Sequence, residues 1–328
     1  MRVWILAFGT FFAAAGTSVQ AGDPLTQVQT IPLPGVEGRI DHMAVDVQGQ
    51  RLLIAALGNH SVEVVGLKEG RRIASLDGLQ EPQGVLFALE FHKLFVANRA
   101  NGMVTVFEGD PFKRVGELDL HEDADNLRYD SATRQVYVGY ADGALGVIDP
   151  ESNKQTASIP LPGHPESFRL EKSGPRIFIN IPGGRVAVVD RSQGRVIQTW
   201  TAGALLKANY PMALDEEQHR LFVGYRAPTR LVVFDTDTGR VVAKLESAGD
   251  ADDIFYDSAR RRVYISGGEG VIVVVAQQNA DQYHVIAKIP TARGARTSFF
   301  VPETHRFYLA VPHRGEQQAE IRVYTVQS

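Results

Sequence analysis

Short apolar stretches recur along the chain after residue 21, and each is followed by a turn rich in Gly, Asn or Asp. Within the stretches, apolar residues either alternate with polar ones or run on without interruption, as in Arg230-Leu-Val-Val-Phe234. Alternation is typical of half-buried β-strands, and a short continuous apolar run is typical of a fully buried strand. The pattern therefore predicts a protein built from short strands with almost no helix.

The strands belong to a unit that occurs seven times. An apolar strand ends at a first landmark, a bulky or aromatic residue of the second strand follows seven residues later, and two further strands complete the unit. The first landmarks are Asp46, Ala88, Asp130, Glu171, Asp215, Asp257 and Val301. Four antiparallel strands in a unit of about 40–45 residues are the signature of a propeller blade. We therefore predict an all-β fold, a seven-bladed β-propeller whose four-stranded blades start near residues 39, 81, 123, 164, 208, 250 and 294.

The two ends of the chain are predicted to share one blade. The seventh unit stops at its third strand, residues 320–324, whereas Gln27–Gly35 resembles the fourth strand of the third unit, Thr156–Gly163. We expect residues 27–34 to pair beside residues 321–326 and close the ring, which removes an exposed sheet edge. Residues 22–328 then form a single propeller domain.

The first 21 residues have the pattern of a secretory signal peptide. Met1-Arg2 provides a positive start, Val3–Gly16 is apolar, and Val19-Gln20-Ala21 ends in a small residue suited to cleavage. An uncleaved N-terminal anchor remains the alternative. No later run is long and apolar enough to span a bilayer. We expect a periplasmic or secreted protein without a transmembrane segment once the signal is removed.

Composition excludes several kinds of chemistry. The chain has no Cys, so disulfides, thiolate metal sites, Fe–S clusters and covalently attached haem are excluded, and no haem is expected. The net charge is −4 and the basic residues are scattered, which argues against nucleic acid as a partner. Gly267–Gly270 is a hairpin turn without the strand-to-helix setting of a phosphate-binding loop, so no nucleotide is expected.

Several of the repeated segments carry a family resemblance. Phe95-Val-Ala-Asn98, Tyr137-Val-Gly-Tyr140, Phe222-Val-Gly-Tyr225 and the run 234–245 resemble the YVTN-repeat, YncE-like seven-bladed propellers of bacteria. The resemblance covers essentially the whole chain after residue 21. It implies an exported propeller, with some relatives suspected of binding DNA, metal or protein partners, and it supplies no catalytic motif.

Candidate functional residues lie in the loops that lead into the first strands, because every blade of a propeller contributes one such loop to the rim of the central channel. Five residues before each landmark stand Asp41, Gln83, Asp125, Glu166, Tyr210, Asp252 and Arg296. The neighbouring positions add Arg39, His42, Asp123, Asn126, His164, Asp250 and Asp253. Four carboxylates in one column predict an acidic channel mouth.

Clustered like charges need a compensating positive charge. Arg39 and Arg296, a divalent cation or a cationic ligand could supply it. We predict metal ligands among Asp123, Asp125, His164, Glu166 and Asp252, with Ca²⁺, Mg²⁺, Mn²⁺ or Zn²⁺ as the ion. The predicted ligand-binding residues are Arg39, Asp41, His42, Gln83, Asn126, Tyr210, Asp253 and Arg296. The alternative is that these side chains bind backbone N–H groups of turns, as we expect for Asp46, Asp130, Asp215 and Asp257 at the strand ends.

Three function classes fit the sequence. The first and favoured one is an exported binding or scaffold propeller that presents its acidic mouth to a metal ion, small ligand or protein partner. The second is a metal-dependent hydrolase or lyase, lactonase-like or streptogramin-lyase-like, with His42 and His164 as candidate catalytic residues for proton transfer. The third is a structural partner in an envelope or redox assembly, which would use the outer surface of the blades.

Overall fold

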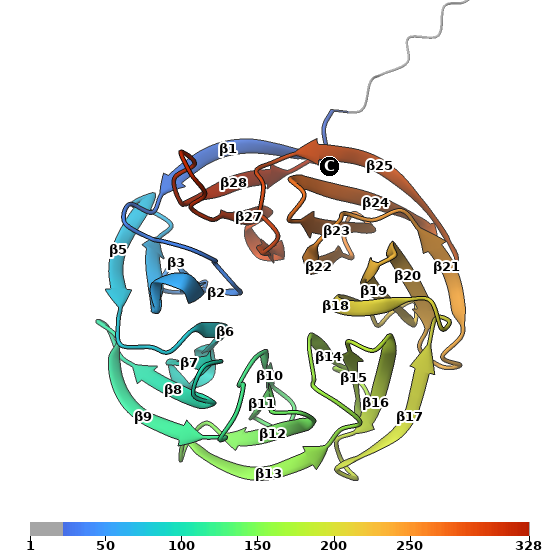
Figure 1. Cartoon of the computed structure of the whole chain (residues 1–328), viewed down its shortest axis with the longest axis horizontal. Helices are drawn as coiled ribbons and strands as arrows, with labels where there is room; N and C mark the ends of the chain where they lie inside the picture. Colours follow the sequence, from blue (N-terminus) through green and yellow to red (C-terminus); the bar gives the residue numbers. More distant parts are fainter. Residues whose placement is uncertain (1–21, 328) are drawn as a thin grey trace, which may run out of the picture.

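The structure, a computed structural model, describes residues 22–327 and contains seven four-stranded antiparallel sheets arranged in a ring around a central channel (Figure 1). The predicted secretion signal, residues 1–21, lies outside the described residues. Within those residues the helical elements are three 3₁₀ turns of three residues each, η1 (Leu57–Asn59), η2 (Leu89–Phe91) and η3 (Pro302–Thr304). None of the described segments is a helix of the length and apolar character that crossing a membrane requires. The predicted all-β, seven-bladed propeller is confirmed.

In six blades the strands follow one another outward from the channel in chain order, and in blade 7 the outermost strand is β1, the first strand of the chain. Blade 1 consists of β2 (Met43–Asp46), β3 (Arg51–Ala56), β4 (Ser61–Gly66) and β5 (Arg71–Leu76). Blade 2 consists of β6 (Pro82–Ala88), β7 (Lys93–Asn98), β8 (Met103–Glu108) and β9 (Lys113–Asp119). Blade 3 consists of β10 (Leu127–Asp130), β11 (Gln135–Tyr140), β12 (Ala144–Asp149) and β13 (Lys154–Pro160). Blades 4 and 5 are β14 (Phe168–Leu170), β15 (Arg176–Ile181), β16 (Arg185–Asp190), β17 (Arg195–Thr201); and β18 (Lys207–Asp215), β19 (Arg220–Ala227), β20 (Thr229–Asp235), β21 (Val241–Leu245). Blades 6 and 7 are β22 (Ala251–Asp257), β23 (Arg262–Gly267), β24 (Val271–Asn279), β25 (Gln282–Pro290); and β26 (Ser298–Val301), β27 (Arg306–Val311), β28 (Glu320–Val326), β1 (Leu25–Pro32).

The first two strands of every blade pair in the same register. On the first strand, the residue two positions before the landmark lies opposite the second-strand residue seven positions after the landmark. Examples are Ala44 opposite Leu53 and Arg128 opposite Tyr137. A turn of constant length fixes this register. Asp46 and Asp130 hold that turn by accepting backbone N–H groups of Gly49 and Ala132 at 2.8 and 3.0 Å. The structural role expected for these aspartates is confirmed, and the constant register carries equivalent loop residues to equivalent places around the channel.

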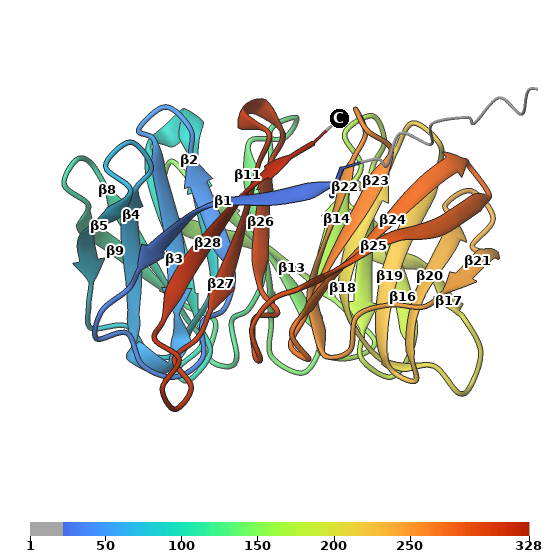
Figure 2. The same ribbon diagram turned by 90° about the horizontal axis from the view of Figure 1, so that it is seen from above.

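The N-terminal strand completes blade 7, as predicted. β1 pairs antiparallel with β28 over the whole strand, from Leu25 opposite Val326 to Pro32 opposite Glu320 (Figures 1 and 2). Beyond the strand ends, the N–H of Gln327 donates to the carbonyl of Pro24 at 2.9 Å. Side chains of β1 that face the blade interior are buried among residues of blades 7 and 1 or of blades 6 and 7. The ring is therefore closed by strands from opposite ends of the sequence.

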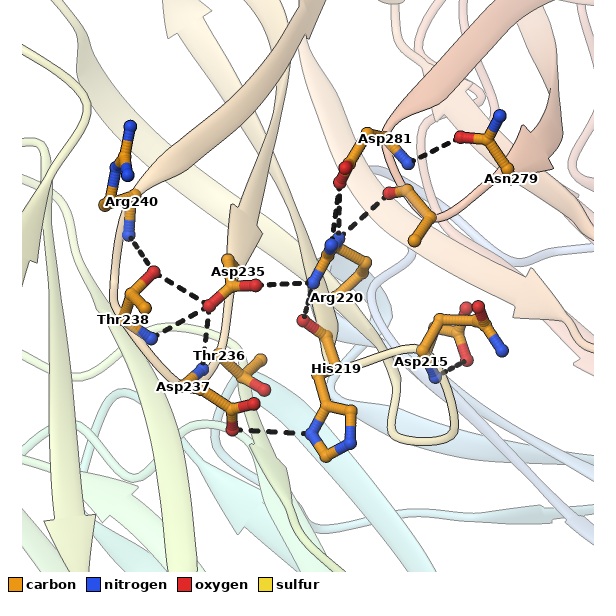
Figure 3. A network of polar contacts seen from close by, with 12 residues as sticks. Asp215, His219, Arg220, Asp235, Thr236, Asp237, Thr238, Arg240, Asn279 and Asp281 are labelled. Carbon is orange, nitrogen blue, oxygen red and sulfur yellow. Dashed lines mark hydrogen bonds and ion pairs between the residues drawn. The ribbon is translucent and has the colours of Figure 1, made fainter.

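Ion pairs and hydrogen bonds made by basic side chains join neighbouring blades at the rim. A basic residue begins the second strand of most blades, and in five of them its side chain reaches the turn that follows the third strand of the next blade. The pairs are Arg51 with Asp110, Lys93 with the carbonyl of Pro150, Arg176 with that of Thr236, Arg220 with Asp281, and Arg262 with the carbonyl of Gln327. Figure 3 shows the fourth contact, in which Arg220 binds Asp281 of blade 6 and Asp235 of its own blade, both at 2.7 Å. These contacts fix adjacent blades relative to each other at the mouth opposite the candidate site.

The closing strand offers a matched pair of substitutions. Ile31 is buried against blades 7 and 1, whereas Val28 of the same strand is 52% exposed. We predict that Ile31→Ala lowers the free energy of unfolding by about 2–5 kcal/mol because it leaves a cavity in the closing blade. Val28→Ala changes it by less than about 0.5 kcal/mol. Urea unfolding of both variants measures the difference. Equal losses of unfolding free energy in the two variants would contradict a stabilising role for the buried face of β1.

Candidate functional site

The predicted acidic residues gather at one mouth of the channel. Arg39 bridges two of them, with Nη2 at 2.7 Å from Oδ2 of Asp41 and 3.5 Å from Oδ2 of Asp252. Asp125 and Glu166, from blades 3 and 4, offer carboxylate oxygens within 4.8 Å of each other. Four carboxylates from blades 1, 3, 4 and 6 thus share a small volume, and the structure divides them into three environments.

Asp252 lies among arginines. Besides Arg39, it contacts Arg226 at 2.6 Å and Arg296 at 3.0 Å, and the latter two also contact Asp250. Burial alone would raise the pKa of Asp252, but Arg226, Arg296 and Arg39 outweigh it and hold that pKa below its usual value. The charge of Asp252 is therefore balanced by the protein itself.

His42 lies between two carboxylates. Its Nδ1 is 3.4 Å from Oδ1 of Asp253 and its Nε2 is 3.7 Å from Oδ1 of Asp41. Burial acts to lower the pKa of His42, but Asp253 and Asp41 outweigh it and raise this pKa to about 10. This pKa favours the protonated imidazole at neutral pH, a state in which His42 can donate a proton but cannot accept one.

The third environment contains Asp125, His164 and Glu166. One ligand atom from each lies within 4.8 Å of the other two. Among the described residues neither Asp125 nor Glu166 forms an ion pair with an arginine or lysine. Burial, followed by repulsion from Glu166, raises the pKa of Asp125 to about 8, and burial, followed by repulsion from Asp252, raises that of Glu166 to about 7. These two carboxylates are the uncompensated part of the mouth.

Close contact between blades 2 and 3 positions Asp125. A side-chain carbon added at Gly84 would lie 2.1 Å from the carbonyl oxygen of Asp125, so no other residue fits at this place. On the other side, the N–H of Asp125 donates to the carbonyl of Gly139 at 2.9 Å. Asn126 donates from Nδ2 to Oδ1 of Asp125 at 3.3 Å. The backbone therefore holds the carboxylate in place from both neighbouring strands.

The other predicted ligand-binding residues surround these groups. Gln83 is buried, and its carbonyl accepts the N–H of His42 at 3.3 Å. The ring of Tyr210 lies under the guanidinium of Arg226, 4.2 Å from its carbon. Asp123 has Oδ2 3.9 Å from Nε2 of His164. All predicted residues thus belong to one mouth.

Arg226 is a residue of the mouth that was not predicted from the sequence. It follows Tyr225 near the end of β19, the second strand of blade 5, whereas the candidate residues were predicted from the loops before the first strands. Its place directly after the recurring Phe-Val-Gly-Tyr segment was the available signal, since Arg99 follows the corresponding segment of blade 2 and also contacts mouth carboxylates, Glu81 and Asp123.

The comparisons with known proteins agree with the fold. No family model matches the chain. The Uncharacterized protein YncE of Salmonella typhi is 21% identical over 256 residues, which cover 73% of this chain and 71% of that protein. The Uncharacterized protein YncE of Salmonella typhimurium is 20% identical over 256 residues, which again cover 73% of this chain and 71% of that protein. The resemblance to YncE-like propellers is confirmed.

Two solved structures share the architecture. A chain of the Kuenenia stuttgartiensis hydrazine synthase superposes with a TM-score of 0.74 at 16% identity, covering 85% of this chain and 95% of that one. A chain of the mitotic checkpoint complex crystal structure superposes with a TM-score of 0.76 at 13% identity, covering 100% of both chains. Identities this low show the fold alone, so any function must be argued from the site.

The divided charge pattern predicts opposite effects of two conservative substitutions in the absence of metal ions. Asp252→Asn leaves three arginines without their shared anion, and we expect it to lower the free energy of unfolding by about 3–5 kcal/mol at pH 8. Glu166→Gln removes a carboxylate whose raised pKa makes ionisation costly in the folded state, so stability is unchanged or higher. Urea unfolding in the presence of a chelator measures both. Similar losses in the two variants would contradict the division of charges.

Proposed function

We propose that this propeller is an exported binding protein whose channel mouth holds a divalent cation and presents it to a small ligand or protein partner. The observation that carries the proposal is the group of Asp125, His164 and Glu166, whose ligand atoms lie within 4.8 Å of one another. Oxygen and imidazole ligands in this number suit a divalent ion with coordination positions left for a partner molecule.

The histidine is oriented as a metal ligand would be. Nδ1 of His164 lies 2.7 Å from the carbonyl oxygen of Ala141, which can only accept, so Nδ1 carries the proton. In the neutral ring, Nε2 then offers its lone pair toward Glu166, whose Oε1 is 3.9 Å away. Metal-bound histidines commonly donate their second N–H to a backbone carbonyl in this way.

A fourth donor lies beside the group. Oδ2 of Asp123 is 3.9 Å from the same Nε2 of His164. Oδ1 of Asp123 is buried without a hydrogen bond, and its charged neighbour, Nε of Arg99, is 3.9 Å away. A cation here would compensate two or three carboxylates that the arginines of the mouth do not pair closely. The side chains of His164 and Glu166 are 26% and 19% exposed, so a ligand could reach the ion from the mouth.

The participation of an imidazole favours Mn²⁺ or Zn²⁺ over Ca²⁺ or Mg²⁺. We expect Mn²⁺ or Zn²⁺ to raise the melting temperature, because an ion that binds only the folded state stabilises it by mass action, by about 2.7 kcal/mol at a concentration 100 times Kd. The double variant Asp125→Asn, Glu166→Gln should lose this response. Differential scanning fluorimetry of the metal-stripped protein measures it.

Glu81→Gln is the matched control, because Glu81 lies at the same mouth but pairs with Arg99 at 2.9 Å. This variant should keep the full response. The response should also be larger at pH 8.5 than at pH 6. Carboxylates with pKa values near 8 and 7 hold protons at pH 6, and the ion must displace them. A response that survives in the double variant, or that grows toward low pH, would overturn the proposed site.

Residues 1–21 supply the reason to propose export, with the periplasm or the extracellular medium as the location. The short positive start, apolar stretch and small residue at position 21 support this part of the proposal.

A further inference from the structure

The channel below the acidic mouth contains a cavity of about 660 Å³ lined by residues from the first strands of all seven blades. Its walls are largely apolar, with Leu86, Leu170, Leu214, Phe255 and Phe299 among the lining residues. A volume in the range of about 300–1,000 Å³ and mostly apolar walls are typical of small-molecule sites. The walls alone do not indicate a ligand, but the charged residues among them do.

Two arginines enter this apolar channel from neighbouring blades. Arg128 and Arg169 each stand two residues before their landmark, in β10 and β14, and both line the cavity. The guanidinium of Arg128 extends toward blade 4 and lies 5.5 Å from the ring centre of Phe168, the neighbour of Arg169. In the other blades this row holds only apolar residues, namely Ala44, Leu86, Ala213, Phe255 and Phe299.

Within the described chain, neither arginine forms an ion pair with a carboxylate. Arg128 donates to the carbonyl of Leu127 at 2.7 Å and to Oδ1 of Asn126 at 3.1 Å. Arg169 donates to the carbonyl of Phe168 at 2.9 Å and to Oγ of Ser167 at 3.3 Å. A guanidinium has five N–H donors, so most of these donors remain available for an anion.

The carboxylates around the cavity are largely engaged elsewhere. Asp253 contacts His42 and accepts the N–H of Ser298 at 2.9 Å. Glu216 accepts the backbone N–H groups of Lys172 and Ser173, and Asp215 accepts from Gln277 at 2.9 Å. Burial, followed by repulsion from Arg128, lowers the pKa of Arg169 to about 9, and the charge of Asp253 offsets only part of this effect. Two like charges in an apolar channel are costly unless an anion compensates them.

We infer that the channel binds a small organic oxyanion, a carboxylate or a phosphate monoester with an apolar body, whose charged group is held by Arg128 and Arg169. The apolar body packs against the leucine and phenylalanine side chains of the cavity wall. Paired arginines suit either oxyanion because each guanidinium can form two parallel hydrogen bonds to it. This site is distinct from the proposed cation site and opposite to it in charge.

The probes for the test are benzoate, phenyl phosphate, inorganic phosphate and the neutral benzamide, measured by isothermal titration calorimetry on the full chain. We expect benzoate or phenyl phosphate to bind, inorganic phosphate to bind at least tenfold more weakly than phenyl phosphate, and benzamide not to bind. The better of the two aromatic anions identifies the oxyanion. Failure of both to bind, or benzamide binding equally well, would overturn the inference.

The variants are Arg128→Gln, Arg169→Gln and the double substitution. Each single change should weaken binding at least tenfold, since about that much is lost with one charge-assisted hydrogen bond. Arg195→Gln is the matched control, an exposed arginine of blade 4 that contacts Gln193, and it should bind as the wild type does. The melting temperature without probe should not fall in the double variant, because the substitution relieves repulsion. Retained affinity in the double variant would refute the assignment.

Glu166→Gln separates the two sites. It removes a proposed cation ligand and leaves both channel arginines, so anion affinity should stay within about twofold of the wild type. Loss of anion binding in this variant, with Arg128 and Arg169 intact, would contradict a separate anion site.

Discussion

The convergence of seven first strands on one axis is the constraint from which the charge pattern of this protein follows. A constant turn between the first and second strands gives every blade the same register, so equivalent residues of different repeats meet at the same height of the channel. Charged residues that are far apart in the sequence are therefore forced together in a partly desolvated space. There each charge must find a partner or shift its pKa.

The protein meets this constraint differently on two sides of the mouth. Toward blades 1, 5, 6 and 7, three arginines surround Asp252 and keep its pKa low. Toward blades 3 and 4, Asp125 and Glu166 have raised pKa values and form no ion pair with an arginine of residues 22–327. Deeper in the same two blades the imbalance is reversed, because Arg128 and Arg169 form no ion pair with a carboxylate within the same residues. Asn126 joins the two regions by accepting from Arg128 and donating to Asp125.

Periodicity was sufficient to predict the fold and the location of the mouth. The spacing from Asp46 to Leu53 and its six counterparts encodes the strand register, and the similarity of residues 27–35 to residues 156–163 encodes ring closure. Asp125 and Glu166 both stand five residues before their landmarks, so the repeat alignment also predicted that they belong to one group. Their neighbour His164 was accessible to the same reasoning because it precedes Glu166 by two residues.

The pairing of charges could not be predicted in the same way. Arg226 reaches Asp252 from a second strand, and a column of first-strand loops does not contain it. Likewise, Arg128 and Arg169 stand in the row of Leu86 and Phe255, where the apolar pattern predicts wall residues. Which guanidinium reaches which carboxylate depends on side-chain conformation and on the tilt of the blades, and neither is visible in a repeat alignment.

The most direct measurement of the cation site is the anomalous diffraction of crystals grown with Mn²⁺ at pH 8. We predict a single strong peak in the channel mouth within coordination distance of a carboxylate oxygen of Asp125, Nε2 of His164 and a carboxylate oxygen of Glu166. A mouth without an anomalous peak at saturating Mn²⁺, or a peak bound only by residues outside this group, would contradict the central claim.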